Sequence, residues 1–300
     1  MAMLLMLVGA VFGEYFSQSY ELGLLLAFGI WILLSILAYF QGRSLFLAIS
    51  GAHKIQKADH PRLFNIVEEM KIAAMLPAMP DIYIIDDPAP NAFAVGQKPE
   101  KAAVAVTSGL LNTLNRDELQ GVIAHEVGHI INRDTLFMSM LGVMLGAIIM
   151  LAEIARRSLF WGGGRRRSRI SSSGGGQAQT IIMIAGLVLM ILAPILARLI
   201  YLAASRKREY LADASAAIFT RYPEGLASAL EKISYSPISM RRVNKVTAPM
   251  CIINPIKKLK AGGSSLFSTH PATEKRVQVL RTMAGGSGYS DYNDAFTRIT

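Results

Sequence analysis

Four apolar runs constrain this chain more than any other feature of its sequence. Residues 22–40 contain 19 residues without a charge, residues 136–152 contain 17 and residues 178–197 contain 20, while residues 1–12 form a shorter run. A helix that crosses the hydrocarbon core of a bilayer needs about 20 apolar residues. The runs therefore predict a membrane protein with about four hydrophobic helices. The alternative for the two mid-chain runs is a helical hairpin buried in a soluble core.

The composition agrees with a membrane protein. Only 17% of the residues are charged and the mean hydropathy is +0.37, whereas a soluble domain carries about 25% charged residues. The net charge of +10 is spread along the chain beside the apolar runs, which indicates contact with a lipid bilayer and not with nucleic acid. The single cysteine, Cys251, excludes an intramolecular disulfide and a multi-cysteine metal site.

The apolar runs divide the chain into four segments. We expect an N-terminal membrane hairpin, the first half of a soluble domain, a hydrophobic helical hairpin with an Arg/Gly-rich loop, and the second half of the soluble domain, at residues 1–40, 41–134, 135–204 and 205–300.

The soluble halves contain few strand signals. DIYIIDD and AAVAVT are short and β-branched and predict two strands, and NAFAVG between them predicts a third. Asn115 and Glu118 form a capping-box pattern before the next helix. SRKREYLADASAAIFT continues the last apolar helix, and the tail after Ala284 is expected to be mobile. The predicted fold class is mainly α with a small β-sheet.

The string GVIAHEVGHIINRDT at residues 121–135 places His125 and His129 four residues apart, with Glu126 between them. Residues i and i+4 share one face of a helix, so both imidazoles can bind one metal ion, as in the HExxH motif of zinc hydrolases. Zinc lowers the pKa of a bound water to about 7. Glu126 would then take the proton of that water and pass it to the leaving amine.

A catalytic zinc site needs a third protein ligand. A histidine six residues after His129 would identify a metzincin, but that position is Thr135, which excludes this class. Glu209 is favoured because Asp213 shares its helix face and offers an acceptor for a histidine N–H. The full set of downstream candidates is Asp134, Glu153, Glu209, Asp213, Glu224, Glu231, His270 and Glu274.

Four strings together resemble the HtpX-type integral-membrane zinc metalloproteases, which share a peptidase family with the CAAX prenyl protease. The strings are AHEVGHIINRD, SRKREYLADASA, PNAFAVG and STHPATEKR, and the resemblance covers nearly the whole chain. Only the first apolar segment departs from it, because it is shorter than such proteins usually have. The resemblance implies a membrane-anchored, zincin-like (gluzincin) metallopeptidase with one zinc ion per chain.

The resemblance also implies the roles of individual residues. His125, His129 and Glu209 would hold the zinc, and Glu126 would be the catalytic base. Asp213 would orient a ligand histidine.

Three further residues are expected near the ligands. Arg206 is expected behind the ligands, and the alternative role for Glu209 and Asp213 is a solvated ion pair with Arg206 or Lys207. The resemblance places Arg276 and His270 close to the active site. His270 would donate a hydrogen bond to the oxyanion, or it would be a plain N-cap residue before Pro271.

By the same resemblance, an edge strand of Asn91, Ala92, Phe93 and Ala94 would pair with the backbone of an extended substrate. The substrates would be polypeptides, in particular misfolded membrane proteins, and the function would be membrane-protein quality control as part of a stress response.

Loop charges predict how the chain lies in the membrane. GEYFSQSYE has two glutamates and no Lys or Arg, whereas residues 41–134 carry nine Lys or Arg, so the soluble domain of a multi-pass cell-membrane protein would face the cytoplasm. His129 and Glu209 can meet only if an even number of crossings separates them. The Arg-rich loop at 156–178 would then lie outside, against the charge rule. The hairpin at 136–197 therefore either crosses fully, or is re-entrant or buried in protein.

Two alternative functions follow from the same residues. One is an intramembrane zinc protease with the HExxH motif inside a spanning helix, although the polar strings NRDELQ and NRD flank this motif. The other is a non-catalytic membrane scaffold with a structural zinc, for which four protein ligands would be usual and Glu126 would have no purpose.

The predicted topology can be tested by cysteine labelling in intact cells. In a Cys251→Ser background, Ser108→Cys and Ser228→Cys should both be protected from an impermeant thiol reagent, because the two halves of a metal site must share one side. Labelling of one position alone would contradict a shared site. Ser172→Cys reports separately on whether the Arg-rich loop crosses the membrane.

Overall fold

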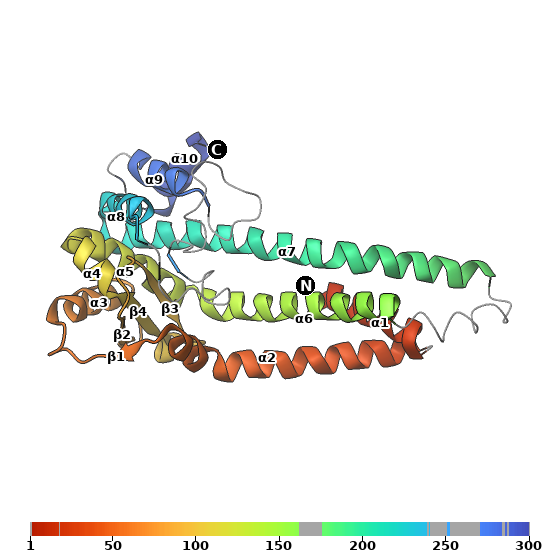
Figure 1. Cartoon of the computed structure of the whole chain (residues 1–300). Helices are drawn as coiled ribbons and strands as arrows, with labels where there is room; N and C mark the ends of the chain where they lie inside the picture. Colours follow the sequence, from red (N-terminus) through yellow and green to blue (C-terminus); the bar gives the residue numbers. More distant parts are fainter. Residues whose placement is uncertain are drawn as a thin grey trace. The chain divides into compact units, whose positions relative to one another are not determined.

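A computed structural model describes residues 2–17, 19–161, 176–238, 240, 251–252, 271–283, 286 and 288–299. The chain divides into two compact units: residues 1–40 with 139–201, here called the helical unit, and residues 41–138 with 202–300, here called the mixed unit. Long helices make up the first unit, and the second contains a small sheet and short helices (Figure 1).

The helical unit contains α1 (Ala2–Ser17) and the apolar parts of three longer helices, α2 (Tyr20–Ser50), α6 (Asp134–Trp161) and α7 (Gly176–Thr220). Each of the longer helices continues from one unit into the other. The predicted extension of the last apolar helix through SRKREYLADASAAIFT is confirmed, since α7 runs without a break to Thr220.

Two helices in the described part of the chain are long and apolar enough to cross a membrane. They are the segments Asp134–Ile154 of α6 and Val188–Thr220 of α7, whereas Tyr20–Ile36 of α2 is apolar but shorter. α1 has 16 residues, which span about 24 Å at 1.5 Å per residue and fall short of a hydrocarbon core of about 30 Å. The prediction of about four membrane-crossing helices is therefore corrected to two candidates.

Many apolar side chains of these helices face outward. Leu25 and Leu33 of α2, Met150 of α6 and Ile191 of α7 are all more than half exposed. Inside the unit, a separate small core joins Leu5 and Val8 to other side chains, namely Ala147, Ile148, Ala193 and Ala197. Apolar surface of this extent on the outside of a helical bundle is unfavourable in water and marks an interaction surface.

The α1–α2 hairpin packs backbone against backbone. Gly9 and Gly13 form a GxxxG pair on α1 and face Gly23 of α2. A Cβ atom at Gly13 would lie 2.5 Å from the Cα and 2.6 Å from the nitrogen of Gly23. Small residues at this spacing let two helices approach closely in a membrane, where packing replaces the hydrophobic effect as the driving force.

The mixed unit contains a four-stranded sheet with strand order β1-β2-β4-β3. The strands are β1 (His53–Lys54), β2 (Asp81–Ile85), β3 (Ala92–Val95) and β4 (Ala103–Thr107). β2 and β4 are parallel, and the other two pairings are antiparallel. The predicted fold class, mainly α with a small sheet, is confirmed, and β3 lies at an edge of the sheet. All four of its residues are nevertheless buried.

The other helices of the mixed unit are short. They are α3 (Pro61–Ala73), the 3-10 helix η1 (Pro99–Lys101), α4 (Ser108–Thr113), α5 (Arg116–Ile131), α8 (Pro223–Tyr235), α9 (Thr273–Thr282) and α10 (Tyr289–Ile299).

α5 is the central helix of the mixed unit and carries the HExxH motif. Its predicted capping box is present, with the Asn115 side chain accepting from the amide of Glu118 and the Glu118 carboxylate accepting from the amide of Asn115. α5 packs against α3, α8 and β3. Gly121 allows the close approach of α8, because a Cβ atom there would lie 2.6 Å from the nitrogen of Leu226.

The expectation of a mobile tail after Ala284 is wrong for the residues that form α10. Tyr292 and Ala295 are buried in the core of the mixed unit, and Phe296 and Ile299 pack against it. Residues 292, 295, 296 and 299 follow helical spacing and share one face. The spacing predicts an amphipathic helix, although the polar composition of the tail had suggested a mobile segment.

The glycine contact between α1 and α2 generates a stability prediction. Gly13→Leu should lower the apparent Tm of the purified protein in detergent by at least a few degrees, because the side chain must push two backbones apart. Gly29→Leu on α2 is the matched control, since a Cβ atom there meets nothing within 4 Å. Equal Tm values for the two variants would contradict the close crossing.

Candidate metal centre

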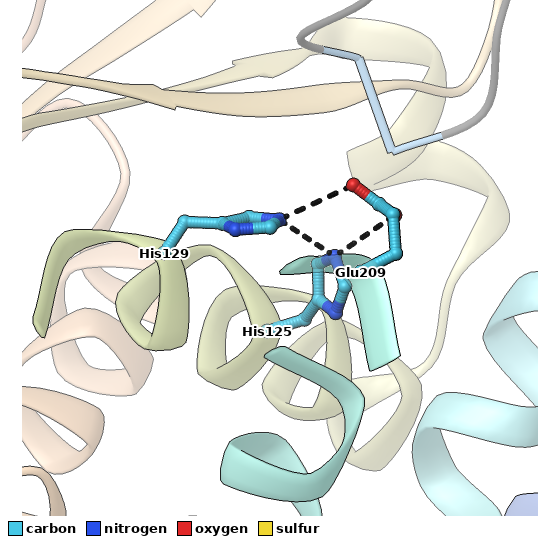
Figure 2. A group of neighbouring side chains, drawn as sticks. All are labelled: His125, His129 and Glu209. Carbon is cyan, nitrogen blue, oxygen red and sulfur yellow. Dashed lines mark hydrogen bonds and ion pairs between the residues drawn. The ribbon is translucent and has the colours of Figure 1, made fainter. Parts of the chain in front are cut away.

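Three possible metal-ligating side chains meet between α5 and α7. His125 and His129 project from one face of α5, and Glu209 projects from α7 towards both rings (Figure 2). The Nε2 atoms of the two histidines are 3.1 Å apart. Nε2 of His125 lies 3.7 Å from Oε2 of Glu209, and Nε2 of His129 lies 3.6 Å from Oε1. Residues 84 positions apart in sequence thus converge on one point.

The geometry suits a zinc ion. Zinc takes imidazole nitrogen and carboxylate oxygen at about 2.0–2.2 Å in a tetrahedral arrangement, which places neighbouring ligand atoms about 3.3 Å apart. The three observed separations lie within 0.4 Å of that spacing. Three protein ligands leave one tetrahedral position for water or substrate, which is the pattern of catalytic zinc sites.

A carboxylate and a buried arginine lie behind His125. Nδ1 of His125 is 3.0 Å from Oδ1 of Asp213. Arg276 is only 1% exposed and donates from Nε and Nη2 to the two oxygens of Asp213, at 2.8 and 2.7 Å. Its Nη1 lies 3.1 Å from Oε2 of Glu209. Asp213 and Arg276 therefore occupy the positions expected of a histidine-orienting carboxylate and its partner.

A second carboxylate lies behind His129, and sequence reasoning did not assign it that role. Oδ2 of Asp134 is 2.8 Å from Nδ1 of His129, and Oδ1 is 2.8 Å from Nη1 of Arg208. Asp134 was one of the candidate third ligands, but it contacts the nitrogen that faces away from Glu209. Its position, five residues after His129 at the start of an apolar run, is the only signal in the sequence that pointed to it.

Glu126 lies beside the ligands and is 1% exposed. The backbone amide of Ala94 donates a hydrogen bond to its carboxylate. Oε2 of Glu126 is buried and has no hydrogen-bond partner among the described residues. Burial, with Glu209 adding to it, raises the pKa of Glu126 to about 7, although the nearby His129 opposes the rise. A carboxylate of this kind can take up and release a proton near neutral pH.

Electrostatics differ between the two histidines in the metal-free protein. Burial lowers the pKa of His125, so its ring is neutral and ready to bind metal. Burial also acts to lower the pKa of His129, but its contacts with Asp134 and Glu209 outweigh that effect and raise the pKa to about 10. In the metal-free protein, a proton on His129 therefore supplies positive charge that balances the surrounding carboxylates.

β3 passes over Glu126 at the edge of the sheet. Asn91 donates its backbone amide to Oγ1 of Thr107, and Ala92, Phe93 and Ala94 are buried. The amide of Ile252 donates to the carbonyl of Ala92 at 3.0 Å. A backbone N–H from another part of the chain thus already pairs with the outer edge of this strand.

Three other candidate ligands among the described residues form ion pairs with arginines. Glu224 and Glu231 bind Arg281, and Glu153 binds Arg157 on the surface of α6. Arg206 is half-buried on α7. Arg276 and Arg208 contact the site carboxylates. His270 lies outside the described residues.

Comparisons with known proteins identify the family of this chain. The profile of the family described as Peptidase family M48 matches residues 57–284. A Protease HtpX homolog of Dictyoglomus thermophilum is 45% identical over 282 residues, which cover 94% of this chain and 88% of that protein. A Protease HtpX homolog of Streptococcus pyogenes is 44% identical over 280 residues, covering 93% of each.

Among solved structures, the crystal structure of S. mikatae Ste24p aligns with a TM-score of 0.49 at 18% identity. The alignment covers 92% of this chain and 62% of that one, so this chain spans less than two thirds of its length.

The raised pKa of His129 predicts how zinc binding depends on pH. Below about pH 10 zinc must displace one proton from His129, so zinc affinity should rise about tenfold per pH unit between pH 7.5 and 9. Titration of metal-stripped protein against a competing chelator measures this slope. A flat profile would show that His129 is neutral before zinc binds.

Proposed function

The chain belongs to peptidase family M48, and from that premise we propose that it is a zinc-dependent membrane endopeptidase with one zinc ion per chain. The observation that carries the proposal is the convergence of His125, His129 and Glu209, with the free Oε2 of Glu126 beside them. This combination has the features of a zincin-like, gluzincin-type catalytic site, because it joins an incomplete set of ligands to a base.

We assign one role to each side chain of the site. A zinc ion held by the two histidines and Glu209 would supply a Lewis acid that polarises the peptide carbonyl and acidifies water. Glu126 holds the proton lost by the attacking water and transfers it to the leaving amine. Asp213 holds His125 in the orientation that presents Nε2, and Arg276 holds Asp213 and Glu209 in place.

The outer edge of β3 is the proposed binding position for substrate backbone. Asn91, Ala92, Phe93 and Ala94 are the residues involved, and the amide of Ala94 also contacts Glu126. The bond from Ile252 to Ala92 supports this assignment, because it is the same kind of contact that an added strand would make. Main-chain pairing would bind unfolded polypeptides with little regard to sequence.

We propose that the enzyme is a multi-pass protein of the cell membrane with its catalytic domain in the cytoplasm. The two candidate spans and the exposed apolar surface of the helical unit support membrane residence. On this proposal residues 1–40 and 135–204 are the membrane segments, and residues 41–134 and 205–300 form the catalytic domain. The substrates would be misfolded membrane proteins, and His270 would donate to the oxyanion.

The structure gives the two alternative functions less support. α5 belongs to the mixed unit and packs against β3, α3 and α8, so the HExxH motif does not lie on a candidate span. A structural zinc would need a fourth protein ligand, yet Asp213 contacts Nδ1 of His125 and is directed away from the metal position. Glu126 would also have no role in a structural site.

Replacement of Glu126 separates catalysis from metal binding. Glu126→Gln should retain about one zinc per chain and lose nearly all hydrolysis of an unfolded test protein, because an amide cannot accept the proton of water. Zinc content by elemental analysis and proteolysis by gel assay are measured on the same preparation.

Glu209→Gln is the matched control, since it makes the same chemical change on a proposed ligand. This variant should lose both zinc and activity, because an amide oxygen is a poor zinc ligand. Loss of zinc from Glu126→Gln as well would assign Glu126 a structural role. Full activity of Glu126→Gln would reject the proposed mechanism.

A further inference from the structure

Each histidine of the site has its own carboxylate and its own arginine. His125 contacts Asp213, which Arg276 holds, and on the other side of the site the chain repeats this arrangement with different residues. Oδ2 of Asp134 is 2.8 Å from Nδ1 of His129, and Oδ1 is 2.8 Å from Nη1 of Arg208.

We propose that Asp134 is the positioning residue of His129, and that Arg208 makes a carboxylate indispensable at that position. The inference rests on the proposed zinc site, because it concerns how His129 is prepared to bind metal. Asp134 would do for the second histidine of the motif what Asp213 does for the first.

The local backbone is shaped to bring Asp134 back to His129. α5 ends at Ile131, and α6 begins at Asp134 after only two residues. Arg133 between them has a φ of 54°, a left-handed conformation that side chains other than glycine rarely adopt. Asp134 follows this turn directly, is 3% exposed, and places its carboxylate against the ring of His129.

The chemistry of the pair depends on which nitrogen carries the proton. Nε2 of His129 points at Glu209 and His125, so its lone pair must be free for a metal ion. The proton must then lie on Nδ1 and be donated to Oδ2 of Asp134. A hydrogen-bond acceptor behind Nδ1 therefore keeps the ring in the form that binds metal.

Arg208 is the reason that this acceptor must be a carboxylate. Nη1 of Arg208 and Oδ1 of Asp134 form an ion pair at 2.8 Å. A guanidinium group carries only N–H donors and a positive charge, so the atom that faces it must be an oxygen. An asparagine has one acceptor and one donor. If its oxygen faces Arg208, its NH2 group faces Nδ1 of His129 and drives the proton to Nε2, which blocks the metal.

Arg208 is well placed for this role. Its guanidinium also lies over the ring of Phe137, 4.7 Å from the centroid, so Asp134 and Phe137 hold it from the first turn of α6. Arg208 precedes Glu209 on α7. The same two helices thus supply a ligand, the positioning carboxylate and the arginine that orients it.

Zinc titration of four metal-stripped, full-length proteins tests the inference without reference to activity. They are the wild type, Asp134→Asn, Arg208→Met and the double variant. Asp134→Asn should weaken zinc binding by about 10- to 100-fold, and Arg208→Met should weaken it by less. The double variant should bind zinc about tenfold more tightly than Asp134→Asn, because the amide oxygen is then free to turn to His129.

Asp81→Asn is the matched control, since Asp81 also pairs with an arginine, Arg43, but lies on β2 away from the ligands. Its zinc affinity should equal that of the wild type. If Asp134→Asn does not fold, Asp134→Ala combined with Arg208→Met leaves neither partner as an unpaired charge. Without metal, this variant should have the same Tm as the metal-free wild type. It should nevertheless bind zinc at least about tenfold more weakly than the wild type.

The outcomes separate the inference from the proposed function. Wild-type zinc affinity in Asp134→Asn, or no recovery in the double variant, would overturn the inference alone. Wild-type protein that takes up no zinc would overturn the proposed function together with the inference.

Discussion

A surplus of buried negative charge governs the mixed unit. Glu126, Asp134, Glu209 and Asp213 are all at least nine-tenths buried around two histidines, and Arg276 and Arg208 contact three of these carboxylates. If all four carboxylates are ionised, two negative charges remain uncompensated, which is the charge of one divalent cation. Buried carboxylates without partners are strongly disfavoured. Burial, with Glu209 adding to it, raises the pKa of Glu126, and contacts with Asp134 and Glu209 raise the pKa of His129 against the effect of burial.

Close helix packing brings these charges together. Gly128 lies inside the HExxH motif, and a Cβ atom there would come within 3.3 Å of the carbonyl of Ala212. α7 can therefore approach α5 closely enough for Glu209 and Asp213 to reach the two imidazoles. The small residues of this motif matter as much as its ligands, because zinc bonds of about 2 Å leave little tolerance in the separation of the helices.

The start of α6 links several parts of the mixed unit through two adjacent side chains. Asp134 contacts His129, and the hydroxyl of Thr135 donates to the carbonyl of Gly96, directly after β3. The histidine of the proposed metal site and the strand proposed to bind substrate are thus both attached to one helical turn. That turn opens a candidate membrane span, so stability of the apolar helix and geometry of the site depend on the same residues.

Local spacing in the sequence determined the helix of the HExxH motif, its capping box, the long apolar helices and the shared face of Glu209 and Asp213. Each depends on contacts within a few residues, for which the period of 3.6 is sufficient. Tertiary structure decided which faces meet. It placed Asp134 behind His129 and not among the ligands, put Arg208 beside Asp134, and buried one face of α10. These outcomes depend on packing between distant segments, because periodicity shows which side chains point together but not what they point at.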